Sequence, residues 1–120
     1  MDSCYYGSDS CGNIVMNSSP SGQYFQENIN QSLAGRTTLV LRMRDWSDTD
    51  TEQHWNVILN DGSDHTVGPV SAYGNITGSY TDISVPLAAF GANLANAKFI
   101  KVVHKDSTYA VLLIDSIKVN

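Results

Sequence analysis

Charged side chains are scarce in this sequence. Only 16% of the 120 residues are charged, against roughly 25% in an average soluble protein. The net charge of −5 disfavours nucleic acid and anionic membranes as partners, because both bind basic surfaces. No apolar run approaches the roughly 18 residues that a transmembrane helix needs. These absences exclude a spanning helix and disfavour nucleic acid and anionic membranes.

Cysteine is almost absent as well, with Cys4 and Cys11 as the only two. In a secreted domain they would close a short loop as a disulfide, whereas in a cytosolic chain they would be free thiols. The Ser-, Thr- and Asn-rich composition is typical of extracellular β-proteins, so we predict secretion and the disulfide. The polar start, MDSCYYGSDSCG, shows no signal peptide and is interpreted as an initiator Met on a domain excised from a larger protein.

Catalytic and zinc motifs are missing too. There is no Gly-x-Ser-x-Gly elbow, and His54, His65 and His104 lack metal-ligand spacing. Most carboxylates fall in predicted loops, whereas glycoside hydrolysis needs two that converge about 5–10 Å apart. We therefore expect no enzyme. A Ser-His-Asp site stays open, because its members converge only in space.

What the sequence does contain is a series of short apolar segments with period-2 alternation, separated by turn residues. The predicted strands lie near 12–17, 22–29, 37–45, 53–60, 65–70, 80–86, 97–105 and 109–119. A strand at 2–6 would bring the count to nine, and 88–96 is expected to be a loop with one helical turn. Such spacing predicts an all-β, two-sheet antiparallel sandwich of about eight or nine strands, as a single domain over 1–120.

Alternation also predicts which side chains face the core. The inward positions are Leu39, Leu41, Met43, Trp55, Val57, Leu59, Ile83, Val85, Leu87, Ile100 and Val102, with Phe90 as a plug. Residues 109–119 carry two competing apolar sets, so that strand is either covered on both faces or bulged.

Three stretches, 37–62, 80–90 and 99–119, together form one ordered pattern. It begins with a strand, a Trp-bearing polar loop and a second strand that ends in Asn-Asp-Gly. The motifs V-P-L-x-x-F and I-D-x-I-x-V follow. Over residues 22–119 this order resembles the β-jelly-roll carbohydrate-binding modules of secreted polysaccharide-degrading enzymes. The resemblance implies a jelly roll and a non-catalytic, monomeric module that anchors a parent enzyme on a polysaccharide. The alternatives are a secreted structural or adhesion sandwich that binds a protein, and a small polysaccharide-active enzyme.

Outward polar positions supply a candidate sugar site, because sugars stack on aromatic rings and bond to amides, arginines and histidines. The candidate residues are Arg42, Arg44, Trp46, His54, Asn56 and Lys101. We expect the strand residues among them to share one exposed face with Trp46 at its rim; alternatively they are ordinary solvated positions. Tyr73, Tyr80 and Tyr109 are alternative stacking platforms.

The resemblance also implies a structural calcium ion. In the stretch Ile114–Ile117, Asp115 matches the position that ligates it, and Asp2 is the early acid that would complete the site. Calcium needs about six to eight oxygen ligands. The alternating acids of 48–52 are a second candidate, although they lack the glycine of a tight calcium loop.

Overall fold

The computed structural model describes residues 14–18, 24–29, 31–45, 53–106 and 110–120. Within them the chain forms eight strands and three short 3-10 helices, and no helix there is long and apolar enough to cross a membrane. The strands are β1 (Ile14–Ser18), β2 (Tyr24–Asn28), β3 (Thr38–Asp45), β4 (Trp55–Asn60), β5 (Asp64–Val67), β6 (Thr81–Pro86), β7 (Phe99–His104) and β8 (Ala110–Val119). The all-β prediction and the eight strand positions are confirmed; the ninth strand, at 2–6, lies outside the described residues.

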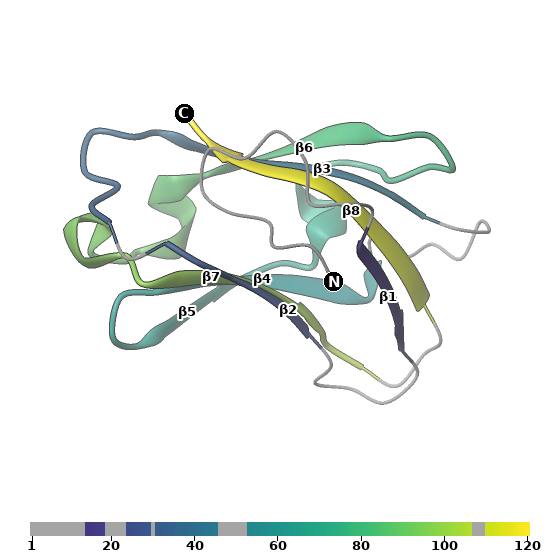
Figure 1. Cartoon of the computed structure of the whole chain (residues 1–120), viewed down its shortest axis with the longest axis horizontal. Coiled ribbons are helices and arrows are strands. Elements are labelled where there is room, and N and C mark those ends of the chain that lie inside the picture. Colours follow the sequence, from purple (N-terminus) through teal and green to yellow (C-terminus); the bar gives the residue numbers. More distant parts are fainter. Residues whose placement is uncertain (1–13, 19–23, 30, 46–52, 107–109) are drawn as a thin grey trace.

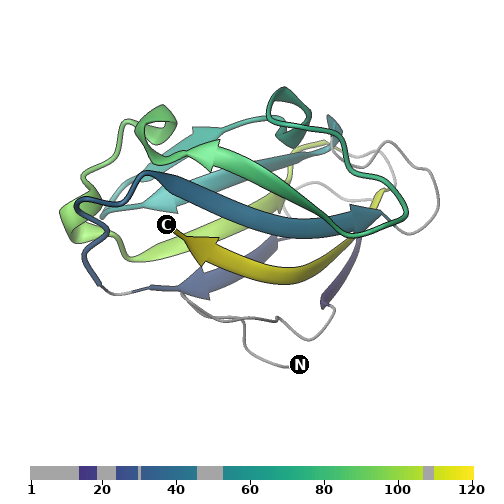
Figure 2. The same ribbon diagram turned by 90° about the horizontal axis from the view of Figure 1, so that it is seen from above.

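Two four-stranded antiparallel sheets face each other in two layers (Figure 1). Sheet A has the order β1-β8-β3-β6, and sheet B has the order β2-β7-β4-β5. Seen from above, β3 runs between β6 and β8 in the layer nearer the viewer (Figure 2). Every consecutive pair of strands except β4–β5 is divided between the two sheets, as in a jelly roll. The predicted jelly-roll sandwich is confirmed.

Among the described strands, β4 and β5 form a hairpin, and the sequence at its turn reads Asn60-Asp61-Gly62. Gly62 has a φ of 113°, a conformation that glycine adopts at little cost. The Asn60 side-chain oxygen accepts the Gly62 N–H at 2.8 Å, and Asp61 accepts the Ser63 N–H at 3.1 Å. These local bonds satisfy the turn backbone and hold β5 at the edge of sheet B.

The core between the sheets consists of the side chains that alternation predicts. Every predicted inward residue is buried, and all of them belong to one apolar cluster. Trp55 is fully buried, and its ring centroid lies 4.9 Å from that of His104. The prediction of a core role for Trp55 is confirmed.

The last strand, β8, contains a bulge, which explains its two competing apolar sets. Arg42 of β3 pairs with Ser116 of β8, but the next residue, Met43, pairs with Ile114. Asp115 is therefore the extra residue, and the inward parity of β8 changes across it. Ile114 on one side of the bulge and Ile117 on the other therefore both face the core. Of the two predicted alternatives for this strand, the bulge is the one observed.

Residues 87–96 form two single turns rather than a strand. The 3-10 helix η3 (Leu87–Phe90) ends at Gly91, whose left-handed φ of 64° stops the turn, and η4 (Leu94–Asn96) follows. A third 3-10 turn, η2 (Val70–Ala72), links β5 to β6. The expectation of a loop over 88–96 is confirmed, although the segment contains two short 3-10 turns where one was expected.

Candidate functional site

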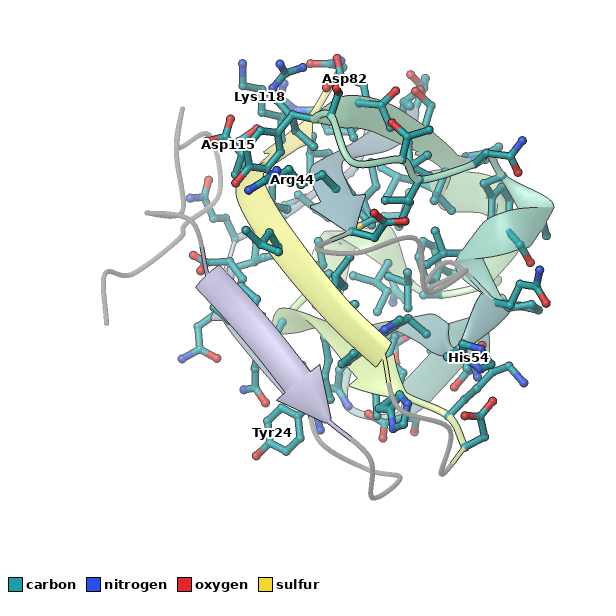
Figure 3. All side chains as sticks on the ribbon, turned by 90° about the vertical axis from the view of Figure 1, so that its right-hand side faces the viewer. Tyr24, Arg44, His54, Asp82, Asp115 and Lys118 are labelled. Atoms are coloured by element: carbon teal, nitrogen blue, oxygen red, sulfur yellow. The ribbon has the colours of Figure 1, made fainter. Side chains whose placement is uncertain are left out.

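The five strand residues predicted to share one face lie on two opposite faces of the sandwich. Arg42 and Arg44 belong to β3 in sheet A, whereas Asn56 and Lys101 belong to β4 and β7 in sheet B, and His54 directly precedes β4. Arg44 lies on the upper layer and His54 on the lower (Figure 3). The prediction of a single shared face is wrong, because alternation separates inward from outward positions but does not say which sheet a strand joins.

Other predicted positions lie outside the described residues. They are Asp2, Cys4, Cys11, Trp46, the acids of 48–52, and Tyr109. The disulfide and the rim position of Trp46 therefore stay predictions.

On the outward face of sheet A, both arginines have partners within the same molecule. The Arg42 guanidinium lies 3.3 Å from the Asp82 carboxylate of β6 and 3.4 Å from that of Asp115 in β8. Arg44 donates to the Gly78 carbonyl at 3.0 Å and lies over the Tyr80 ring, 5.3 Å from its centroid. Both arginines thus join neighbouring parts of the same molecule.

The position of Asp115 bears on the calcium site. Its carboxylate is on the outward side of the β8 bulge, against the Arg42 guanidinium. A cation at that distance opposes a second cation by direct repulsion, so this environment does not fit a calcium ligand. No group of three or more His, Cys, Asp or Glu side chains within the described ranges is arranged to hold a metal. Asp2 lies outside them, so the calcium site stays a prediction.

The outward face of sheet B has a different composition. We call it the platform. Strand pairing arranges its residues in three rows: Tyr24, Val103 and Asn56; Gln26, Lys101, Ile58 and Thr66; and Asn28, Phe99, Asn60 and Asp64. The residues that alternate with them include Trp55, Val57, Leu59, Ile100 and Val102 of the core, which leaves the platform side chains facing away from it. Two predicted residues, Asn56 and Lys101, are brought together here as neighbours on adjacent strands.

Aromatic rings flank the centre of the platform. Tyr24 is 55% exposed and is the one exposed large hydrophobic side chain among the described residues. The Lys101 ammonium nitrogen lies 4.2 Å from the centroid of the Tyr24 ring and 5.4 Å from that of Phe99. Tyr24 is a diagonal cross-strand neighbour of Lys101, and Phe99 precedes it by two residues on the same face. The two rings and the cation form one continuous surface.

Amide side chains surround these rings. Gln26 donates to the Asn28 side-chain oxygen at 2.9 Å, which leaves the Gln26 oxygen and the Asn28 amide hydrogens available to a ligand. Asn56 makes no side-chain hydrogen bond to another described residue. Asn60 is engaged in the hairpin, since it donates to Asp64 at 2.7 Å and accepts the Gly62 N–H. The donors and acceptors that a ligand can reach thus lie in all three rows.

His54, at one end of the platform, belongs to a small polar cluster. Its Nδ1 lies 2.9 Å from Asp106 Oδ2, and the other Asp106 oxygen lies 3.7 Å from Nε2 of the buried His104. The His54 carbonyl accepts the Lys105 N–H at 2.9 Å. These contacts join the segment before β4 to the end of β7. His54 is therefore better explained as a structural residue than as a ligand-binding one.

Asp61 fastens the opposite end of the platform. It accepts the Asn93 N–H at 2.7 Å and lies 3.1 Å from His65 Nε2. The Asn93 N–H lowers the pKa of Asp61 below its usual 3.8; burial opposes the shift, and the Ser63 N–H and His65 add to it. The β4–β5 turn is thereby tied to the loop that precedes β7.

Beyond the same end lies a shallow polar hollow of about 270 Å³. Its lining residues are Gln31, Ser32, Ala95, Asn96, Ala97 and Lys98. Pockets that enclose a small molecule usually hold about 300–1,000 Å³. The platform is thus an open surface beside a small hollow, a shape suited to an extended ligand.

Tyr24, Gln26, Asn28 and Phe99 were not among the residues singled out from the sequence. The signal that could have found them is their period-2 alternation within the predicted strands 22–29 and 97–105. What the sequence could not show is that β2 pairs with β7, which sets Tyr24 beside Lys101.

Comparisons with known proteins add no relative. No protein-family model matches this chain, and a search of curated proteins gives no match.

Proposed function

We propose that this chain is a non-catalytic carbohydrate-binding module that holds a polysaccharide on the platform. The observation that carries the proposal is the Tyr24 ring, 55% exposed on an outward strand position beside Lys101 and Phe99. Single exposed rings are common on protein surfaces, but Tyr24 shares its face with the Phe99 ring and with three amide side chains. A sugar ring can bind to such a surface, because its C–H face stacks on the face of an aromatic ring.

The amides of the platform support the same ligand class. Sugar hydroxyls both donate and accept, and the side chains of Gln26, Asn28 and Asn56 offer both kinds of group. Because these residues lie on β2 and β4, which both pair with β7 in one sheet, their spacing is held by the backbone ladder. A rigid surface loses little conformational entropy when it binds.

Binding rather than cleavage is proposed because of the carboxylates. Hydrolysis of a glycosidic bond uses two acids, about 5–10 Å apart, on either side of the bond. Asp64 is the one acid among the described platform residues, and it accepts a hydrogen bond from Asn60 at 2.7 Å. A secreted module of this kind would serve a larger multidomain enzyme by raising its concentration at the polymer.

Electrophoresis in gels that contain soluble polysaccharides tests the proposal. The wild-type chain should be retarded by at least one polymer, and Tyr24→Ala should lose about 1–2 kcal/mol of binding free energy, the value of one stacking contact. Tyr80→Ala is the matched control, because it removes the same side chain from the side of sheet A, where Tyr80 lies against Arg42 and Arg44. It should keep the retardation.

Other outcomes point to the rival functions. Migration unaffected by every polymer, in wild type and Tyr24→Ala alike, would contradict the proposal and favour a module that binds a protein. Release of reducing sugar from a retarding polymer would identify an enzyme.

A further inference from the structure

Lys101 is placed unusually for a surface lysine. It lies on β7, one of the two central strands of sheet B, in the middle row of the platform. Its ammonium group is held between two aromatic rings, 4.2 Å from the Tyr24 centroid and 5.4 Å from the Phe99 centroid. Ring faces attract a cation and fix its position on the surface. The charge is therefore presented at the place where a stacked sugar would lie.

Two other cations of the sandwich have carboxylate partners close by. Arg42 contacts two carboxylates, and Lys105 lies 3.8 Å from Asp106. Lys101 makes no ion pair within the described part of the chain. The single acid described on its face, Asp64, is two strands away on β5, roughly 10 Å at the usual strand spacing. The centre of the platform thus carries one uncompensated positive charge on a chain whose net charge is −5.

We infer that the platform selects a polysaccharide with anionic groups, with sugar rings on Tyr24 and Phe99 and an anion at the Lys101 ammonium. The inference rests on the proposed function and narrows its ligand class. A bound sugar would displace water from around Lys101, and the weaker screening strengthens an ion pair there. Unlike the planar guanidinium of arginine, an ammonium is a compact charge with no fixed donor geometry. It can therefore bind the carboxylate of a uronic acid and a sulfate ester equally well.

Paired polymers with the same sugar backbone, one charged and one neutral, test this inference. Isothermal titration at constant ionic strength would compare polygalacturonate with its methyl ester, and a sulfated galactan with the same galactan after desulfation. The charged member of at least one pair should bind about tenfold more tightly than its neutral partner, equivalent to about 1.4 kcal/mol. The pair that shows the preference identifies the anion as carboxylate or sulfate. Added salt should reduce the preference.

Three variants assign the preference to one side chain. Lys101→Met keeps the unbranched apolar stem and should bring the affinity ratio of the preferred pair to about one. Lys101→Arg keeps the charge and should retain most of the ratio. Lys118→Met is the matched control, because it makes the same change in net charge on the outward side of sheet A (Figure 3). It should keep the full ratio.

The two proposals fail in different ways. Equal affinity for charged and neutral members, or a preference that survives in Lys101→Met, would overturn the inference and leave carbohydrate binding standing. Tighter binding of the neutral members would also overturn the inference and leave carbohydrate binding standing. Absence of binding to all four polymers, repeated over the wider gel panel, would overturn both. Thermal melts of the variants verify that each is folded during titration.

Discussion

The outward faces of the two sheets both carry polar side chains, but these make different contacts among the described residues. On sheet A, Arg42 forms ion pairs with Asp82 on the neighbouring strand and with Asp115 at the β8 bulge. On sheet B, the amides and Lys101 surround an exposed Tyr24, and no carboxylate contacts that lysine within the described residues. Polar groups that neutralise one another stabilise the fold, whereas those left open beside an exposed ring mark a surface for a ligand.

The largest expected effect comes from the core beneath the platform. Trp55→Ala should lower the free energy of unfolding by about 3–5 kcal/mol, because it leaves a cavity next to His104 that the sheets cannot fill. Chemical denaturation of the variant measures this loss. Tyr24→Ala, on the outward side of the same sheet, is the control and should change stability by less than about 0.5 kcal/mol. Equal losses in the two variants would contradict the assignment of inward and outward sides.

The next effect concerns the end of the platform held by Asp61. Because its pKa is lower in the folded chain than its usual 3.8, the carboxylate adds stability above that pH, and the contribution is lost as the pH falls through the folded value. Asp61→Asn should therefore melt below wild type at pH 7. The difference should shrink as the pH is lowered through and below 3.8. A difference that is constant over this range would show that the charge of Asp61 is not responsible.

A smaller effect is expected on sheet A. Arg42→Met should lower the unfolding free energy by at most about 1 kcal/mol, the usual range for partly exposed ion pairs. Its polysaccharide binding should match that of wild type in gel retardation, the reverse of Tyr24→Ala. Loss of binding in Arg42→Met would show that sheet A, not the platform, carries the site.

The smallest expected change in stability distinguishes two roles of Asp115, as the ion-pair partner of Arg42 or as a calcium ligand. If the Arg42 contact is its main role, Asp115→Asn should lower stability by less than about 1 kcal/mol, equally with and without chelator. Differential scanning calorimetry with and without EDTA measures both conditions. A melting temperature that EDTA lowers in wild type but not in Asp115→Asn would instead establish the calcium site, since metal bound only to the folded state stabilises it by mass action.

The candidate site was only partly predictable. Asn56 and Lys101 were predicted from their parity and do lie together on the platform, but Arg42 and Arg44 do not join them. Tyr24 and Phe99 carried the same parity signal and were overlooked, because exposed aromatic residues on predicted strands cannot be told from residues that seal a core until the pairing is known. The two competing apolar sets of the last strand did indicate a bulge, and that bulge places Asp115 against Arg42.

The strand positions and the buried side chains follow from the amino-acid pattern alone, because alternation is a property of single strands and requires only that one side meet a core. Which strands share a sheet depends on how they pair in the folded chain. In this jelly roll β3 crosses to β4 in the other sheet, so Arg42 and Lys101 face opposite directions although both are outward. Pairing between strands distant in the chain depends on contacts that no local pattern contains. The meeting of Tyr24, Lys101 and Phe99 on one face depends on that pairing.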